Sequence, residues 1–465
     1  MSQESQKPST AATPNVSRRN FLTTGAAAGG LAMAAPSIIK AQSSSDEINV
    51  GIIGIGEQGR AQIDATLPIK NVKFRAVCDI WSYSQRYGQR YLTRSGHEIP
   101  DDKVYEDYRK LLEDKSLDAI LIATPDFMHA PMTADALSAG KHVYCEKLMS
   151  NTVEGARKMV KASQDTGKLL QIGHQRRSNP RYLHAKAKLF NSKEKGGADI
   201  FGRITNANAQ WNRSVSEDRT WPKKYVIDDA TLKKYGFKNM HEFRNWRWFK
   251  GLGGGPISDL GAHQIDIFNW FLDAKPKSVQ ASGGVDYYDT HEWHDNVMAI
   301  YEFDTPEGVA RAFYQVLTTT SAGGGFFEYF MGDEGCMKIS EIPRLTKIYR
   351  EARAPEWDGW VDRNFIKQSA AAKKSGDEEV KVDVRESAAL VEYLLPIELK
   401  KKIHQPHLEN FFEAVRMFGS DKKKAKGHLN CPGETALETT VTVLRVNEAI
   451  EAKKTIQFKD EDFKV

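Results

Sequence analysis

Cysteine is scarce in this chain, and long apolar runs and a strong excess of charge are absent. The four cysteines among 465 residues lie far apart and form no CxxC pair, so no disulfide framework is indicated. Cys78 and Cys145 fall in apolar strand patterns, and we expect them to be buried thiols. No segment after residue 42 is apolar enough to cross a bilayer. The 66 Lys and Arg nearly balance the 61 Asp and Glu, which argues against a nucleic-acid partner.

The N-terminal segment has the features of an export signal. Residues 17–22, Ser-Arg-Arg-Asn-Phe-Leu, precede a short apolar stretch, 25–35, that is rich in Ala and Gly. A charged start, a short apolar stretch and a small-residue end are typical of a signal peptide, and Arg-Arg with Phe-Leu indicates the twin-arginine (Tat) route for folded proteins. We therefore predict a Tat signal over residues 1–42, a periplasmic protein, and the Tat export machinery as a partner.

Other interpretations of this segment remain open. Cleavage after Ala41 would place Ile39, which is not small, three residues before the cut, and an uncleaved signal would tether the protein to the membrane. A disordered basic N-terminus is the other alternative. Because the segment carries four basic residues and one acidic residue, its removal lowers the net charge from +5 to about +2.

Residues 43–172 alternate short apolar runs with helical patterns. This order is typical of a parallel, doubly wound α/β sheet of the Rossmann type. Strands are predicted at Ile48–Ile53, Val72–Val77, Ala119–Ala123, His142–Cys145 and Leu169–Ile172, and helices at Pro131–Ala139 and Val153–Ser163.

The first predicted strand runs directly into a glycine-rich turn, GIGEQG, at residues 54–59. A GxGxxG turn between a strand and a helix binds a dinucleotide, with the pyrophosphate on the helix N-terminus. Gly54 permits the tight turn, Gly56 lets the backbone approach the pyrophosphate, and Gly59 allows close helix–strand packing. Glu57 and Gln58 are counted with the cofactor-binding residues because they begin the helix.

Asp79 ends the second predicted strand, 20 residues after Gly59. A carboxylate at this place accepts the adenosine ribose hydroxyls and repels a 2′-phosphate, so NAD is favoured. Arg75 and Arg86 lie near enough in sequence to keep NADP as an alternative. A structural glycine turn with a capping aspartate is the other interpretation of this constellation.

Two further strand ends contribute polar residues to the same edge of the sheet. Thr124 and Pro125, in the sequence ATPD, close one strand, and Glu146-Lys147 closes the next. Because ligands of such sheets lie at the carboxyl ends of the strands, we assign Thr124, Pro125 and Glu146 to the cofactor site. Lys147 would place an ammonium near the nicotinamide; an exposed surface lysine is the alternative.

Residues 173–465 change in character and predict a second domain with a mostly antiparallel sheet. Strands are expected at Val279–Asp286, Asn296–Phe303, Val309–Thr318 and Phe326–Met331, and helices at Leu408–Met417 and Thr435–Ile450. The stretch 345–405 is charged, irregular and rich in Lys, and we expect it to be an insertion or a surface excursion.

The sequence GGGPISDLGAHQID, residues 253–266, is the informative motif of this half. In a helix, Asp259 and His263 are four residues apart and share a face. A histidine beside a carboxylate is a plausible proton acceptor; a buried structural histidine is the alternative.

Five motifs, GIIGIGEQG, ATPD, HVYCEKL, GHQRRSNP and GGGPISDLGAHQID, stand in the order found in one family. The chain resembles the glucose-fructose oxidoreductase / inositol dehydrogenase / MocA (Gfo/Idh/MocA) family over most of 47–345 and again over 406–452. The resemblance implies a Rossmann domain, an α/β domain whose open sheet supports homo-oligomers (a dimer or tetramer), and an active site between them.

The resemblance also implies roles for individual residues. Lys147 matches the lysine of the family's Glu-Lys-Pro motif, although Leu148 stands where proline is usual. His263 matches the family's helix histidine and Asp259 its acidic partner. Gln175 and Arg176 match the segment that borders the nicotinamide and the substrate.

These residues predict an NAD(P)-dependent oxidoreductase that acts on a CH–OH group of a sugar or polyol. His263 would take the hydroxyl proton, Lys147 would polarise the oxygen, and Asp259 would orient His263 and favour its charged form. Trp248 is a candidate for the rim of the cleft, and His294 a candidate for substrate contact. Because export would strand a released NADH, we expect a tightly bound cofactor that is recycled on the enzyme.

Three alternatives remain open at this point. The first is a redox-neutral NAD-dependent glycoside-cleaving enzyme or epimerase that works through a keto intermediate. The second is a non-catalytic sugar-binding protein. The third is a metal enzyme built on His291 and His294, although no convincing third ligand accompanies this pair.

Overall fold

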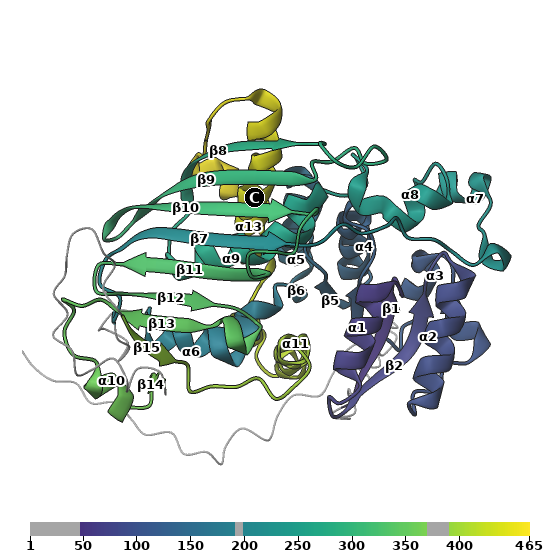
Figure 1. The fold of residues 1–465 in the computed structure, drawn as a ribbon. Helices are drawn as coiled ribbons and strands as arrows, with labels where there is room; N and C mark the ends of the chain where they lie inside the picture. The colour runs from purple at the N-terminus through teal and green to yellow at the C-terminus, as the bar shows by residue number, and fades with distance from the viewer. Residues whose placement is uncertain (1–46, 191–198, 370–389) are drawn as a thin grey trace, which may run out of the picture. The chain divides into compact units, whose positions relative to one another are not determined.

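The computed structural model describes residues 47–190, 199–369 and 390–465. The predicted signal segment, residues 1–42, lies outside the described residues. Residues 46–465 form one unit, which is built around two sheets (Figure 1). The described residues contain no helix that is long and apolar enough to cross a membrane.

The first sheet is parallel throughout, with strand order β3-β2-β1-β4-β5-β6. Its strands are β1 (Ile48–Ile53), β2 (Val72–Cys78), β3 (Val104–Tyr105), β4 (Ala119–Ile122), β5 (His142–Cys145) and β6 (Leu170–Ile172). Strands β4 and β5 are buried along their whole length, which explains why they appear in the sequence as unbroken apolar runs. The strand order reverses at β1, and ligands bind beside such a reversal.

Helices connect these strands and cover the sheet. They are α1 (Glu57–Thr66), α2 (Ser82–Arg94), α3 (Tyr108–Leu112), α4 (Asp126–Ser138) and α5 (Val153–Thr166), with a short 3-10 turn at Asp101–Lys103. The α5 bounds follow from its caps: the Thr152 side chain accepts from the Gly155 N–H, and Gly167 ends the helix at φ 69°.

The second sheet has the order β14-β15-β13-β12-β11-β7-β10-β9-β8-β16. Its strands are β7 (Ile204–Asn212), β8 (Pro276–Gly284), β9 (Asn296–Thr305), β10 (Gly308–Leu317), β11 (Phe326–Gly332), β12 (Gly335–Ile339), β13 (Lys347–Arg350), β14 (Lys367–Gln368), β15 (Val391–Leu394) and β16 (Ile456–Gln457). Every pair is antiparallel except β7 with β10. The fold is therefore α/β, with a parallel sheet followed by a mostly antiparallel one, as predicted.

Helices α6 (Pro180–Lys188), α9 (Ala262–Phe271) and α13 (Gly433–Ala452) pack against one face of this second sheet (Figure 1). Ile265 and Phe268 of α9 and Val446 of α13 join the buried core there. On the opposite face Met298 and Ile300 are exposed, because alternate residues of a strand point to opposite faces.

The stretch 345–405 extends the second sheet in its described parts. Strands β13, β14 and β15 add to its edge, and a short helix, α10 (Asp358–Asp362), lies between β13 and β14. Ile348, Trp357 and Tyr393 are buried in the same core, so apolar side chains within a Lys-rich sequence hold this stretch against the sheet. Residues 370–389 lie outside the described residues.

The C-terminal helices return to the first sheet. Phe411 and Phe412 of α11 (Gln405–Phe418) share a buried cluster with Val50 and Phe74, and Ala436 and Leu437 of α13 pack against the opposite side. The remaining elements of this region are α12 (Lys422–His428) and a 3-10 turn at Asp460–Phe463. Segments that are far from the first domain in sequence therefore complete its core.

Residues 213–252, here called the cover segment, connect β7 to α9. They contain α7 (Asp229–Lys234), α8 (Met240–Asn245) and 3-10 turns at Lys223–Tyr225 and Trp246–Trp248. Leu232, Phe237 and Met240 of this segment form a buried cluster with Trp81, which follows β2. The cover segment therefore packs on the first domain.

Candidate active site

A cavity of about 880 Å³ lies at the carboxyl ends of the parallel strands. The loops after β1, β2, β4 and β5 line one side, and the cover segment, β7, α9 and the residues before α11 line the rest. Most of the predicted site residues line this cavity, namely Gly54, Gly56, Glu57, Gln58, Asp79, Thr124, Pro125, Glu146, Lys147, Gln175, Trp248, Asp259 and His263. Gly59, Arg176 and His294 are not among its lining residues.

The glycines of residues 54–59 make a cradle that fits a dinucleotide pyrophosphate. Gly54 has φ +89°, and a Cβ there would lie 2.5 Å from the Ala123 carbonyl oxygen. A Cβ on Gly59 would lie 2.0 Å from the Gly54 oxygen, so Gly59 serves close packing rather than ligand contact. No atom of the described residues lies within 4 Å of a Cβ on Gly56, which leaves open space above the first turn of α1 for an anion.

The Asp79 carboxylate is fixed at the end of β2. Its two oxygens accept the Ile55 N–H at 2.7 Å and the Trp81 N–H at 2.8 Å. Burial raises the pKa of Asp79 to about 6, although both backbone bonds and the nearby Arg60 and Arg244 act in the opposite direction. Each oxygen retains a lone pair, so the group still suits ribose hydroxyls.

Arg75 and Arg86, the two arginines that left NADP as an alternative cofactor, do not line the cavity. Arg75 pairs with Glu47 at 2.6 Å, and the guanidinium of Arg86 lies 5.9 Å from the ring of Tyr225.

Glu146 is held by two amides from α1. Its Oε1 accepts Gln58 Nε2 at 2.9 Å and Gln62 Nε2 at 2.7 Å. Gln58 also lies 3.4 Å from Nε2 of His404, a cavity residue that precedes α11. Because His404 is more than 200 residues from its neighbours in sequence, no local pattern indicated its place in the site.

Lys147 and Asp259 meet at the reacting end of the cavity. The Lys147 ammonium donates to the backbone oxygen of Asp259 and lies 3.7 Å from its carboxylate. Arg247 Nε donates to the same carboxylate at 3.0 Å. Burial opposes the ionised form of Asp259, but Arg247 and Lys147 hold the pKa of Asp259 well below its usual range. The peptide bond between Lys147 and Leu148 is cis.

His263 lies on the same cavity but does not pair with Asp259 as we expected. Burial lowers the pKa of His263 well below its usual value, and the charges of Lys147 and Arg176 act in the same direction. Its Nδ1 has no hydrogen-bond partner among the described residues, and its ring lies 5.6 Å from that of Trp211. The ring is therefore held neutral, which is the form that accepts a proton.

A π-helical turn explains why the expected pair is absent. Residues Ile257–Gly261 form this turn directly before α9. A π turn holds more residues than an α turn and changes the angle between side chains four positions apart. Asp259 faces the two cations, while His263 faces Trp211.

Gln175 lines the cavity, and the next residue, Arg176, is buried outside its lining. Arg176 is buried between two carboxylates, Glu328 and Glu341, and its Nε lies 2.9 Å from Glu341. Gln175 Nε2 donates to Glu341 at 3.2 Å. Burial raises the pKa of Glu328 to about 7. Arg176 thus holds the carboxylates of Glu328 and Glu341 in place. Of these two, Glu341 lines the cavity.

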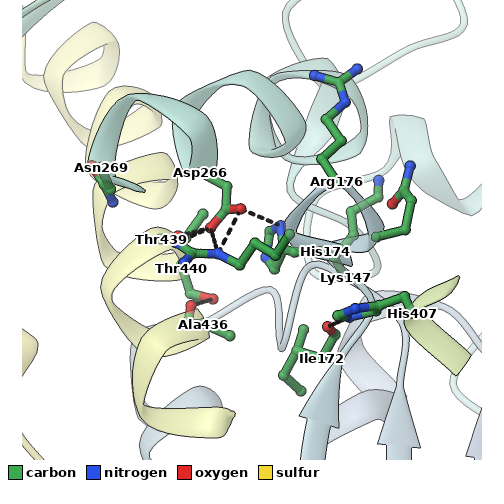
Figure 2. A network of polar contacts seen from close by, with 12 residues as sticks. Lys147, Ile172, His174, Arg176, Asp266, Asn269, His407, Ala436, Thr439 and Thr440 are labelled. Atoms are coloured by element: carbon green, nitrogen blue, oxygen red, sulfur yellow. Dashed lines mark hydrogen bonds and ion pairs between the residues drawn. The ribbon is translucent and has the colours of Figure 1, made fainter. Parts of the chain in front are cut away.

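A buried ionic network beneath the site connects the segment that follows β6 with α9 and α13 (Figure 2). Asp266 of α9 accepts both Nε and Nη2 of Arg177 at 2.9 Å and the Thr439 hydroxyl at 2.8 Å. His174 lies 3.9 Å from the same carboxylate, and burial lowers the pKa of His174 to about 4. The network anchors the helix that carries His263.

Trp248 lines the cavity, whereas His291 and His294 are not among its lining residues. Trp248 stacks on His291 at 4.6 Å between ring centroids, and Tyr288 stacks on the other face of His291 at 4.3 Å. His291 Nε2 lies 3.1 Å from Asp218. Among residues 47–190, 199–369 and 390–465, no group of three or more His, Cys, Asp or Glu could hold a metal ion.

Comparison with known proteins agrees with this geometry. Residues 48–174 match the family model described as oxidoreductase family, NAD-binding Rossmann fold, and residues 198–336 match the GFO/IDH/MocA C-terminal domain. The chain belongs to the Gfo/Idh/MocA family of oxidoreductases. Its first domain is an NAD-binding Rossmann domain.

The curated relatives that the chain matches have different names. It is 28% identical to an inositol 2-dehydrogenase of Rubrobacter xylanophilus over 49% of this chain and 61% of that protein. It is 27% identical to a glycosyl hydrolase family 109 protein of Shewanella baltica over 55% and 58%. The chain thus spans about three fifths of the length of these curated relatives.

The solved structures that it resembles share its fold. A levoglucosan dehydrogenase in complex with NADH and L-sorbose superposes with a TM-score of 0.62 at 16% identity, over 89% of this chain and 99% of that one.

Proposed function

We propose that this family member is an exported NAD-dependent oxidoreductase that acts on a CH–OH group of a sugar or polyol and recycles a retained cofactor. One observation carries the proposal: Lys147 and His263 line the same cavity as the glycine-rich turn (Gly54 and Gly56) and Asp79. A proton acceptor and a cation thus lie within one cavity with a dinucleotide cradle. The name of one relative, inositol 2-dehydrogenase, supports a sugar or polyol substrate, and a structure of the same fold is named levoglucosan dehydrogenase.

The side chains divide the work of alcohol oxidation. NAD, held along residues 54–59 and Asp79, would supply the hydride acceptor. Neutral His263 takes the hydroxyl proton as the C–H bond breaks. Lys147, fixed by the Asp259 carbonyl, donates to the substrate oxygen and stabilises its developing negative charge. Asp259 acts as a positioning residue, because its carboxylate and carbonyl hold Arg247 and Lys147 in place.

The cover segment supports retention of the cofactor. Trp81 Nε1 donates to the Tyr225 oxygen at 2.6 Å, the Tyr235 hydroxyl donates to Glu106 at 2.7 Å, and Arg219 pairs with Glu57 at 2.6 Å. These contacts join the cover segment to the loops on which the adenosine half of NAD would lie. We infer that NAD leaves only when these contacts break, so each turnover is completed with the same molecule.

The proposed location is the periplasm, reached through the Tat route. The support is the sequence of residues 1–42 and its fit to retention, since a folded protein is exported with its ligand in place. The exposed apolar side chains Met298, Ile300 and Val309 on one face of the second sheet support a homo-oligomer.

A redox-neutral glycoside-cleaving enzyme is the second candidate. The observation that favours it is a second imidazole, His404, which lines the same cavity near Glu146. Oxidation at one ring carbon acidifies the neighbouring C–H, and elimination then needs a further base. The name of the Shewanella baltica relative, a glycosyl hydrolase family 109 protein, agrees with this reaction class.

Sugars and glycosides offered to the purified protein test the proposal. A net oxidoreductase reduces its bound cofactor when a sugar is added, and a second carbonyl compound reoxidises it. A redox-neutral enzyme releases the aglycone of a glycoside without net reduction. A protein that does neither with a broad panel of sugars, polyols and glycosides contradicts both candidates.

A further inference from the structure

Arg213 follows β7 and lines the reacting end of the cavity. Its backbone N–H donates to the Leu317 oxygen at 2.9 Å, which fixes the start of its side chain. Its guanidinium carbon lies 5.9 Å from the Trp211 ring. No carboxylate in the described part of the chain lies within 4.0 Å of the Arg213 guanidinium.

Three other arginines in or beside the cavity have carboxylate partners, whereas Arg244, which also lines it, lies over the Trp81 ring and donates to the Thr220 oxygen. Arg247 donates to Asp259, Arg176 pairs with Glu328 and Glu341, and Arg219 pairs with Glu57. The carboxylate that Arg213 influences is Asp259, which already contacts Arg247 and Lys147 more closely. The Arg213 guanidinium is therefore a partly buried charge whose N–H groups have no partner among the described residues. Such a charge is unfavourable unless a ligand accepts hydrogen bonds from it.

Charges of both signs surround the Arg213 guanidinium. Lys147 and Arg247 lie at this end, and the carboxyl groups of Glu146, Glu217 and Glu341 line the same cavity. The feature that would attract an anion is therefore the unpaired Arg213 guanidinium rather than a net positive charge of the lining.

The Trp211 ring lies near both the Arg213 guanidinium and the His263 imidazole. Its ring stacks on Phe326 at 4.4 Å and lies 5.6 Å from His263. An apolar aromatic face suits the C–H face of a sugar ring. A ring that lies on Trp211 would have its reacting hydroxyl toward His263 and Lys147, and another substituent toward Arg213.

We propose that the substrate is a sugar acid whose carboxylate is bound by Arg213. A guanidinium presents parallel donors that match a carboxylate in a bidentate pair, and one unpaired arginine matches one negative charge. This inference deepens the proposed function and rests on it: Arg213 selects the sugar, while Lys147 and His263 perform the oxidation.

Matched substrate pairs test the inference on the purified holoprotein. D-Glucuronate is compared with D-glucose, and D-galacturonate with D-galactose, with reduction of the bound cofactor as the readout. We expect the uronates to have the lower KM. Arg213→Gln should raise the KM for uronates by roughly 10- to 100-fold, the range for loss of a charged hydrogen bond, and should therefore remove most of the preference for uronates over the matched neutral sugars.

Arg311→Gln is the matched control, because Arg311 pairs with Glu302 on β9, outside the cavity. Equilibrium binding of D-glucuronate to the unmodified protein, which should weaken with added salt, keeps the test independent of how well the variant folds. Neutral sugars that work as well as uronates would overturn the inference alone. So would an Arg213→Gln variant that loses NAD but keeps its preference. Failure of all four sugars and of the wider panel would instead contradict the proposed function.

Discussion

The Lys147 ammonium donates a hydrogen bond to the backbone oxygen of Asp259. This bond joins the end of β5 in the first domain to the π-helical turn that precedes α9 in the second. The cation of the site is thereby positioned from both domains, beside the helix that carries His263.

Replacement of Lys147 should abolish most of the activity. Lys147→Met keeps the length of the side chain but removes the charge that stabilises the developing alkoxide, so we expect turnover to fall by roughly 10²- to 10³-fold. NAD content should be unchanged. Lys161→Met is the control, because Lys161 pairs with Asp165 on the exposed side of α5. Equal turnover in the two variants would exclude the proposed role.

The pH profile should report the neutral state of His263. Because burial and nearby cations lower the pKa of His263, the base form persists below the ordinary value of about 6.5. We therefore expect kcat/KM to hold as the pH falls from 7.5 to about 6. A fall centred at or above the ordinary histidine value would show that the ring is charged in the working enzyme. His263→Gln should remove the base and lower turnover across the range.

Asp79 should make cofactor affinity depend on pH. Burial raises the pKa of Asp79 to about 6, so the carboxylate accepts ribose hydroxyls best above that pH and becomes protonated below it. NAD should bind several-fold more weakly at pH 5 than at pH 7.5, as measured by titration of protein freed of cofactor. Asp79→Asn should bind weakly at both pH values. Affinity that does not change with pH in the unmodified protein argues against the ribose contact.

The cover segment should control how fast NAD leaves. Arg219→Gln combined with Tyr235→Phe removes an ion pair and a hydrogen bond between this segment and the first domain. Since the hydrogen bond contributes about 1 kcal/mol and the exposed ion pair about 0.5 kcal/mol, the release rate of NAD should rise roughly tenfold, as followed by exchange with labelled NAD. Arg311→Gln should leave that rate unchanged. Release as slow in the double variant as in the unmodified protein would contradict the proposed enclosure.

The network around Asp266 should govern stability. Asp266→Asn leaves the Arg177 charge buried without a compensating carboxylate, which costs about 3–5 kcal/mol. Denaturant unfolding should shift accordingly, and the more conservative Thr439→Val, which removes only one bond to Asp266, should cost about 1 kcal/mol. A midpoint that does not move in Asp266→Asn would show that the network contributes little.

The sequence predicted those elements that a pattern within the segment itself specifies. The strands β1, β2, β4 and β5 were predicted because buried parallel strands form continuous apolar runs. The GxGxxG turn was predicted from the spacing of its glycines. Strand β7 was not predicted, since its sequence, ITNANAQWN, is polar and its place is set by pairing with β10 about 100 residues later. The strands β13 to β15 were obscured by the Lys-rich composition around them.

The site residues could likewise be predicted only where a motif within one segment marks them. Lys147 and His263 were predicted from motifs, and the structure places both on one cavity. The pairing of Asp259 with His263 was predicted from α-helical spacing, and the π-helical turn changes that spacing. Arg213, Glu341 and His404 reach the cavity from distant segments, so no short pattern could indicate them.

The most direct test of the central claim is the cofactor content of the full chain purified without added nucleotide. The protein would be denatured and the released small molecules analysed by mass spectrometry for NAD(H) and NADP(H). Retention of the cofactor predicts near-stoichiometric NAD(H). An empty protein that also fails to bind added NAD would contradict it, because neither retention nor on-enzyme recycling could then operate.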